Sequence, residues 1–325
     1  MNGASYAVTG VGTFWGRELA GRLKERAEGN RVLALDLHRP HGLEPGVDFQ
    51  YLDLIDTRAA QTLGETLRAR GVESLVHLAF RQSPGPNLAL DHALEVEGSR
   101  AVLDACAAAD VARVVIPSTT MLYGPKAGNP NFLTESWPLA GHPHAHCVQN
   151  RAEVERLAAV WAEAHPASAV SLIRSCWALG ARFRNYVTRT FERPVVSTCL
   201  GHDPLLQFIH EEDLLGIYEE AAATAHPGIF NAVGRGVVPL SRLLALAGKK
   251  RLPLPEAALE FLGEHGGGRA GARGNGDEAS GFYDYLRYLW VADGELGWAE
   301  FGEPRYSTQE AWVDFVSSDE QAFES

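Results

Sequence analysis

Three glycines near the N-terminus are spaced as they are in turns that bind a pyrophosphate. They follow an apolar run and precede an amphipathic stretch, so the sequence predicts a turn between a strand and a helix. Glycine lets the backbone approach the phosphates, and the positive end of the helix favours their charge. Asp36 ends the next apolar run, 20 residues after Gly16 (36 minus 16), where a carboxylate can accept hydrogen bonds from ribose hydroxyls. The predicted dinucleotide-binding turn consists of Gly10, Gly12, Thr13, Phe14, Trp15 and Gly16.

A second group of reactive residues lies near the middle of the chain, at the start of another amphipathic stretch. Cys147 precedes Arg151 by four positions. A thiol has a pKa of about 8.5 and a neighbouring cation lowers it, so Cys147 could exchange a proton with a substrate. The alternative is that Cys147 is a small, partly buried apolar residue. His146 is a further candidate for a general base.

The histidines around this position alternate with other residues. In an extended chain His142, His144 and His146 would point to one side, which is a suitable spacing for zinc ligands. Pro143 opposes a regular strand there, so a polar loop rich in histidine is the favoured interpretation. We therefore predict no metal site.

The composition of the chain narrows the class of protein. Of its 325 residues 46% are hydrophobic, and the formal net charge is −12. An acidic balance opposes non-specific binding to nucleic acid or to an anionic membrane. The sequence contains no apolar run long enough to span a bilayer and no signal peptide. Its four cysteines are widely spaced, which is typical of a reducing cytoplasm.

Apolar runs alternate with amphipathic stretches through the first half of the chain. This alternation predicts an α/β fold built on an open parallel sheet. The expected strands cover residues 6–9, 32–36, 49–54, 74–79, 113–117 and 170–173. The expected helices cover residues 17–26, 91–109, 151–164, 283–292 and 308–316.

Motifs along nearly the whole chain resemble those of the extended short-chain dehydrogenase/reductase family, in its NAD-dependent epimerase/dehydratase branch. The glycine turn resembles the family's TGxxGxxG, and residues 152–157 and 207–213 resemble its AEAERL and QFIHVDDL segments. The resemblance implies a Rossmann-type, doubly wound parallel sheet with a smaller C-terminal substrate-binding region. It implies NAD as cofactor, with further contacts from Asp53, Leu54, Leu78, Ala79 and Ser118.

The resemblance also implies a division of the chain. Residues 1–180 are expected to form the cofactor-binding domain, with 208–232 returning to it. Residues 181–207 and 233–325 are expected to form the substrate-binding region, in which the glycine-rich segment 263–281 is a flexible loop. A homodimer is implied as well, because family members commonly pair two helices per subunit. The candidate faces are the helix over 91–109 and the apolar stripe of Val154, Leu157, Ala158 and Trp161.

The sequence departs from the family at the active site. The family pairs a tyrosine with a lysine four residues later, and these positions are Cys147 and Arg151 here. Thr119, which would polarise the substrate oxygen, is kept, whereas Glu95 and Ser175 replace the usual asparagine and proline. Thr13 replaces the central glycine of the family's turn, beside Gly12. The dinucleotide side therefore matches the family better than the reactive side.

The substrate side is expected to include Tyr123, Arg182, Asn185 and Arg189. Arginines at these positions can bind a diphosphate or a carboxylate through two hydrogen bonds. They could equally be solvated surface charges. Three functions remain open: a nicotinamide-dependent reductase, epimerase or dehydratase acting on a small hydroxy or keto substrate or on a sugar-nucleotide-like one; a non-catalytic NAD(P)-binding sensor or partner protein; and a lyase or cyclase without net redox change.

Overall fold

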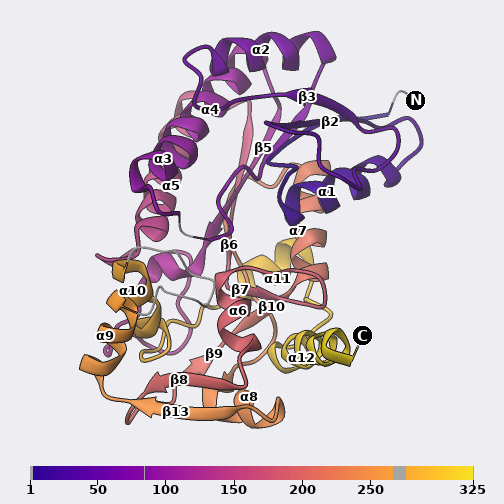
Figure 1. Cartoon of the computed structure of the whole chain (residues 1–325). Helices are drawn as coiled ribbons and strands as arrows, with labels where there is room; N and C mark the ends of the chain where they lie inside the picture. The colour runs from indigo at the N-terminus through magenta and orange to yellow at the C-terminus, as the bar shows by residue number, and fades with distance from the viewer. Residues whose placement is uncertain (1–2, 84, 266–275, 325) are drawn as a thin grey trace.

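A seven-stranded parallel sheet forms the centre of the molecule (Figure 1). The computed structural model describes residues 3–83, 85–265 and 276–324. The sheet order is β11-β6-β5-β4-β1-β2-β3, so the chain starts in the middle and winds out in both directions. This arrangement confirms the predicted α/β, doubly wound fold class. The strands are β1 (Ser5–Thr9), β2 (Arg31–Asp36), β3 (Asp48–Tyr51), β4 (Ser74–His77), β5 (Arg113–Thr119), β6 (Ala169–Ser175) and β11 (Gly228–Ala232).

Helices cover both faces of the sheet because its strands are apolar on both sides. One face packs against α1 (Phe14–Glu25), α7 (Glu211–Ala223) and α11 (Glu295–Phe301). The other face packs against α2 (Ala59–Arg70), α4 (Gly98–Ala108) and α5 (His146–Ala164). These two layers place the carboxyl ends of β1, β4, β5 and β6 at one edge, where the cavities described below lie.

The remainder of the chain forms a second core beyond that edge (Figure 1). Small strand pairs support it: β7 (Trp177–Leu179) with β10 (Phe208–His210), β9 (Leu205–Leu206) with β12 (Val238–Pro239), and β8 (Val195–Cys199) with β13 (Lys250–Leu254). Its helices are α6 (Tyr186–Glu192), α8 (Leu240–Leu246), α9 (Glu256–His265), α10 (Gly276–Tyr285) and α12 (Thr308–Glu324). The flexible loop predicted over 263–281 is wrong at its ends, because residues 263–265 belong to α9 and residues 276–281 to α10. Residues 266–275 lie outside the described residues.

Two predicted helices differ from the structure. The stretch over 91–109 is split into α3 (Leu88–His92), the π-helical turn η1 (Ala93–Glu97) and α4. The helix predicted over 283–292 is wrong, because α10 already ends at Tyr285. The apolar residues that follow are buried by tertiary contacts instead: Trp290 donates its indole N–H to the Tyr285 carbonyl, and Ala292 forms a β-bridge with Leu133.

The apolar stripe of α5 faces the sheet of its own subunit. Val154, Ala158 and Trp161 are buried in the core between α5, α4 and the sheet, and Leu157 packs against the same core. The stripe therefore already has a partner inside one chain. Within the described residues, no helix combines the length and the apolar character needed to cross a membrane.

Candidate functional site

The glycine turn links β1 to α1 through close backbone contacts. Gly10 has φ +73°, and a Cβ there would lie 2.4 Å from the Leu78 carbonyl carbon. A Cβ on Gly16 would lie 2.3 Å from the Gly10 carbonyl oxygen. Thr13 caps α1: its hydroxyl donates to the Gly10 carbonyl at 2.7 Å and accepts from the Gly16 amide at 3.2 Å. The turn therefore needs glycine at both positions.

Asp36 holds the other side of this turn. Its carboxylate accepts the Gly12 amide at 2.8 Å and the Leu37 amide at 2.7 Å. A cavity of about 420 Å³ opens between the turn and the ends of the neighbouring strands, and we call it the turn cavity. Predicted cofactor residues that line it are Gly10, Gly12, Thr13, Asp36, Asp53, Leu54 and Ala79.

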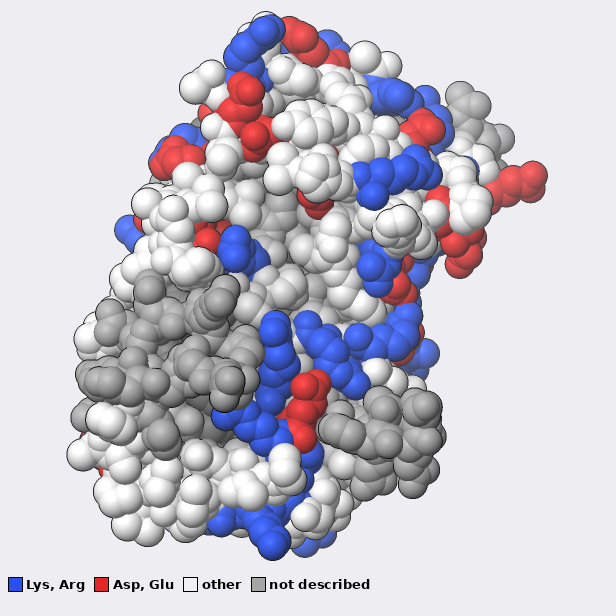
Figure 2. Space-filling model, in the orientation of Figure 1, with Lys and Arg blue, Asp and Glu red and all other residues white. Residues whose placement is uncertain are grey.

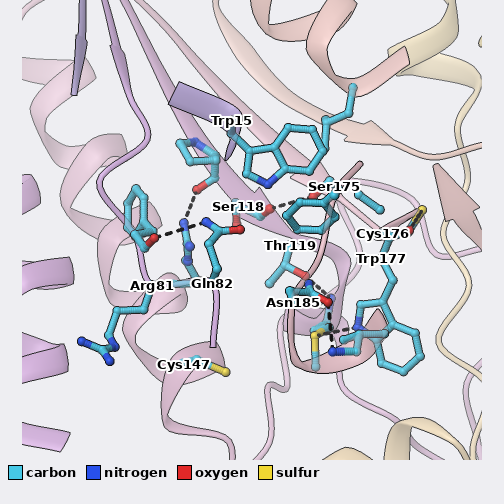
Figure 3. Close-up of a pocket in the computed structure, with 18 of the residues that line it drawn as sticks. Trp15, Arg81, Gln82, Ser118, Thr119, Cys147, Ser175, Cys176, Trp177 and Asn185 are labelled. Carbon is cyan, nitrogen blue, oxygen red and sulfur yellow. Dashed lines mark hydrogen bonds between the residues drawn. The ribbon is translucent and has the colours of Figure 1, made fainter. Parts of the chain in front are cut away.

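A second cavity of about 150 Å³ lies further along the edge of the sheet, and we call it the inner cavity (Figure 3). Phe80, Arg81 and Gln82 line both cavities and join them. Predicted residues in the inner cavity are Trp15, Leu78, Ser118, Thr119, Cys147, Arg151 and Asn185. Of the predicted turn residues, Phe14 packs against Trp15 and Phe183 beside this cavity, and Gly16 lies beneath Gly10.

Arg151 forms part of the wall of the inner cavity. Its guanidinium carbon lies 3.5 Å from the centre of the Phe80 ring, and its Nη1 donates to the Pro117 carbonyl at 3.0 Å. Burial lowers the pKa of Arg151 from its ordinary value, and the nearby Glu95 carboxylate raises it again. Arg151 is therefore a fixed cation at the position of the family's lysine, and a guanidinium cannot relay a proton.

Cys147 lies between the inner cavity and a small chamber of about 30 Å³. His146 lines the chamber but not the inner cavity, so it does not face Thr119. The buried carboxylate of Glu95 also lines the chamber, where it accepts from the Arg81 amide at 3.1 Å and from Asn150 Nδ2 at 2.9 Å. Since Glu95 lies on the π-helical turn η1, the irregular helix brings a carboxylate close to Cys147.

Thr119 ends β5 and faces the inner cavity. Its Oγ1 accepts the Met121 amide at 3.2 Å, which leaves the hydroxyl proton available for donation. The neighbouring Ser118 donates to Glu155, which forms a buried ion pair with Arg174 at 2.6 Å. Thr119 is therefore adjacent to a buried network of hydrogen bonds and an ion pair that holds the end of β5 in place.

Tyr123 belongs to the same buried network. Its hydroxyl donates to Asn231 Oδ1 at 2.7 Å and accepts from Arg174 Nη1 at 3.1 Å. Its side chain is fully buried, and it lines neither the turn cavity nor the inner cavity. The predicted substrate residue thus ties the end of β5 to β11 in this structure.

The alternating histidines do not converge. His142 is buried and its Nε2 lies 2.9 Å from Asp284 Oδ2, whereas His144 is exposed and His146 begins α5. In the part of the chain that the structure describes, no three His, Cys, Asp or Glu side chains are arranged to hold a metal.

Basic side chains gather on the face shown in Figure 2, around the region of α6. Arg182 is engaged by Glu18, Glu211 and Glu212. Arg189 donates to Ser83 at 3.0 Å, and Ser83 lines the turn cavity. Asn185 caps α6 by accepting the amides of Val187 and Thr188. The structure therefore places Arg189 and Asn185 beside the cavities, and Arg182 in a cluster of carboxylates.

Several residues of the site were not predicted. Phe80, Arg81 and Gln82 follow β4, and the carboxyl ends of parallel strands are where ligands bind in such sheets, so their position was a usable signal. Met121, Trp177 and Tyr186 also line the inner cavity. Their apolar and aromatic types resemble ordinary core residues, so the sequence alone gave no signal for them.

Comparisons with known proteins agree with this architecture. Solved structures of similar fold include a dTDP-glucose 4,6-dehydratase from Bacillus anthracis in complex with NAD (15% identity, 99% of this chain and 98% of that one, TM-score 0.73). Another is the UDP-glucose 4-epimerase of Thermus thermophilus in complex with NAD (19% identity, 98% and 99% coverage, TM-score 0.73).

Relatives by sequence include uncharacterized proteins of Mycobacterium tuberculosis and Mycobacterium bovis, 28% identical over 95% of this chain and 82% of theirs. The model of the NAD dependent epimerase/dehydratase family matches residues 6–231. The resemblance is thereby confirmed, and NAD is confirmed as the cofactor of the family. The chain belongs to the NAD-dependent epimerase/dehydratase family.

Proposed function

We propose that the chain is an NAD-binding protein of the epimerase/dehydratase type whose chemistry on a small hydroxyl or keto substrate is altered or lost. The observation that carries this proposal is the contrast between a glycine turn that keeps Gly10 and Gly16, with Asp36 hydrogen-bonded to Gly12, and a reactive side with Cys147 and Arg151 in place of tyrosine and lysine. Several structural neighbours are complexes with sugar nucleotides, for example a UDP-glucose 4-epimerase from Thermotoga maritima bound to UDP-glucose.

The residues present fit NAD. Neither Gly10 nor Gly16 has room for a Cβ, which is the close backbone packing of a pyrophosphate-binding turn, and the turn cavity beside them is open. In this proposal Gly12 and Thr13 hold the pyrophosphate, Asp36 accepts from the ribose, and Asp53 and Leu54 lie against the adenine. When bound, NAD supplies the acceptor or donor of a hydride.

Thr119 and Cys147 are the protein's own groups at the reacting atoms in this proposal. The Thr119 hydroxyl donates to the substrate oxygen and fixes its position. A proton would then have to pass through the Cys147 thiol. This pair exchanges protons less effectively than a phenol beside a lysine, because Arg151 keeps its charge and does not exchange a proton. We favour altered or lost chemistry over a working thiol acid for this reason.

The direct test is a titration of the purified protein with NADH and NADPH, followed by fluorescence, together with mass spectrometry of any ligand released on denaturation. We expect NADH to bind more tightly, because the Asp36 carboxylate repels a 2′-phosphate. Tighter binding of NADPH would contradict the proposal.

A second candidate is a non-catalytic NAD-binding sensor or partner protein. The contacts of Arg151 with Phe80 and Pro117 favour it, because they commit the cation to the wall of the cavity. A lyase or cyclase without net redox change is the third. A protein that binds NADH but transfers no hydride to any ketone of a broad panel would favour these alternatives over an altered hydride transfer.

We also propose that the chain forms a homodimer, as the resemblance to the family implies, and that it is located in the cytoplasm. We further propose that the chain divides at residue 180 and that residues 208–232 return to the cofactor-binding domain. The buried stripe of α5 leaves the outer surfaces of α4 and α5 for such pairing. Light scattering at micromolar concentration tests the dimer, and a mass of 35.3 kDa would reject it.

A further inference from the structure

The inner cavity has two sides with different chemistry. Leu78, Pro117, Ser118 and Ser175 lie at or just beyond the ends of the sheet strands, on the side that continues into the turn cavity. The opposite side is built by the start of α5, by β7, by the start of α6 and by the 3-10 turn η2 (Thr120–Tyr123). Figure 3 shows Trp177 and Asn185 of this second side close to Thr119, the last residue of β5, with Cys147 at the lower left.

The second side is mainly apolar. Val148 and Val187 are 1% exposed, and Met121 and Trp177 are 6% exposed. Trp177 packs in turn against aromatic rings of the second core, with centroid distances of 5.4 Å to Phe282 and 4.9 Å to Trp290. This wall is therefore held by packing and cannot easily turn polar groups toward a ligand.

Most polar atoms of this side already interact with the protein. The indole N–H of Trp177 donates to the Met121 sulfur at 3.3 Å, and the Tyr186 hydroxyl donates to the same sulfur at 3.8 Å. The side-chain oxygen of Asn185 accepts two backbone amides of α6. Thr119, with a hydroxyl proton to donate, and the Cys147 thiol are the groups placed to meet a substrate oxygen.

We propose that this site takes a compact carbonyl or hydroxyl compound whose remaining surface is apolar, and not a hexose. The inference rests on the proposed function, because it assigns the substrate class of the same NAD-dependent site. One oxygen of such a compound meets Thr119, and its carbon skeleton meets Met121, Trp177 and Val187. The ring hydroxyls of a hexose that face Met121, Trp177 and Val187 would be buried there without partners, and each costs about tenfold or more in affinity.

The test compares cyclohexanone with scyllo-inosose, which has the same six-carbon ring and ketone but carries five further hydroxyls, and adds UDP-glucose as a third probe. Binding is measured by calorimetry, with and without saturating NADH. We expect cyclohexanone to bind at least tenfold more tightly than inosose, and we expect no binding of UDP-glucose.

Val187→Thr adds one hydroxyl to the cavity wall at nearly constant volume. It should therefore weaken the binding of cyclohexanone several-fold and reduce the ratio between its affinity and that of inosose. Val160→Thr makes the same change on the exposed face of α5 and should alter neither affinity. Tighter binding of inosose or UDP-glucose, or no cyclohexanone binding to a protein that binds NADH, overturns the inference. Failure to bind NADH overturns the proposed function instead, and the measurements without NADH then still decide the substrate class.

Discussion

The turn cavity and the inner cavity lie along one edge of one sheet, yet they differ in how closely they follow the family. Around the turn cavity, the glycine turn and Asp36 are present and are bonded to each other. Around the inner cavity, a thiol and a guanidinium replace the phenol and the amine, and an apolar wall faces Thr119. The comparison teaches that the residues expected to bind the cofactor and those expected to exchange a proton lie on different elements, so one set can change while the other is kept.

Restoring the family's residues in the inner cavity should have the largest effect. The double substitution Cys147→Tyr with Arg151→Lys should raise hydride transfer from NADH to a panel of ketones, including apolar ones, by about 100- to 10,000-fold, the usual contribution of a general acid. The decrease of NADH absorbance measures it.

The matched control is Cys147→Ala, which we expect to leave the low rate of the natural protein unchanged. A natural protein that reduces a ketone rapidly, and loses that activity in Cys147→Ala, would show instead that the thiol is the acid.

The next largest effect concerns the buried ion pair of Glu155 and Arg174, beside the inner cavity. Glu155→Gln removes one charge from the buried pair with Arg174, whose side chains are about 5% exposed, and should lower the free energy of unfolding by about 3–5 kcal/mol. Urea denaturation measures it. Asp48→Asn, in the exposed pair with Arg70, should cost less than about 1 kcal/mol. Equal costs for the two changes would contradict a structural role for the buried pair.

A smaller change tests the turn cavity. Asp36→Ser removes the carboxylate that accepts from the ribose of NADH, so NADH should bind about tenfold more weakly. The same change removes the charge that repels a 2′-phosphate, so the affinity for NADPH should rise relative to that for NADH. Fluorescence titration measures both cofactors. Asp104→Ser, on the exposed surface of α4, should leave the preference unchanged. An unaltered preference in Asp36→Ser would mean that this carboxylate does not select the cofactor.

The most gradual effect is a dependence of stability on pH from His77, which is buried at the end of β4. Burial, together with the charge of Arg151, lowers the pKa of His77 from 6.5 to about 3. The unfolded chain therefore binds a proton between these pH values that the folded protein does not. Its contribution to stability is complete above about pH 6.5 and decreases as the pH falls toward 3, by at most about 1.4 kcal/mol per pH unit.

Urea denaturation at several pH values measures this slope. His77→Gln should flatten it, whereas His38→Gln, at an exposed position, should not. The neutral ring is held in place by Thr9 at 2.7 Å and Ser99 at 3.0 Å, so His77→Gln should also lower stability at neutral pH. An unchanged slope would show that other groups carry the acid sensitivity.

The sequence by itself determined the parallel sheet and the turn cavity. Their signals are local: an apolar run, a glycine turn and a carboxylate at the end of the next strand require only neighbouring residues and the rules of βαβ units. The replacement of tyrosine and lysine by Cys147 and Arg151 could likewise be predicted from the sequence. The two positions lie at a fixed spacing before residues 152–157, which resemble the family's AEAERL segment.

Only the tertiary structure decided the rest of the site. It stacks Arg151 on Phe80, brings Glu95 to the chamber behind Cys147, buries Tyr123 against Asn231, and makes Trp177 a cavity wall. It also ends α10 at Tyr285, where contacts with distant residues replace helical ones. The physical reason is that these arrangements join residues from elements far apart in the chain, and their side-chain types are the same ones that fill an ordinary core.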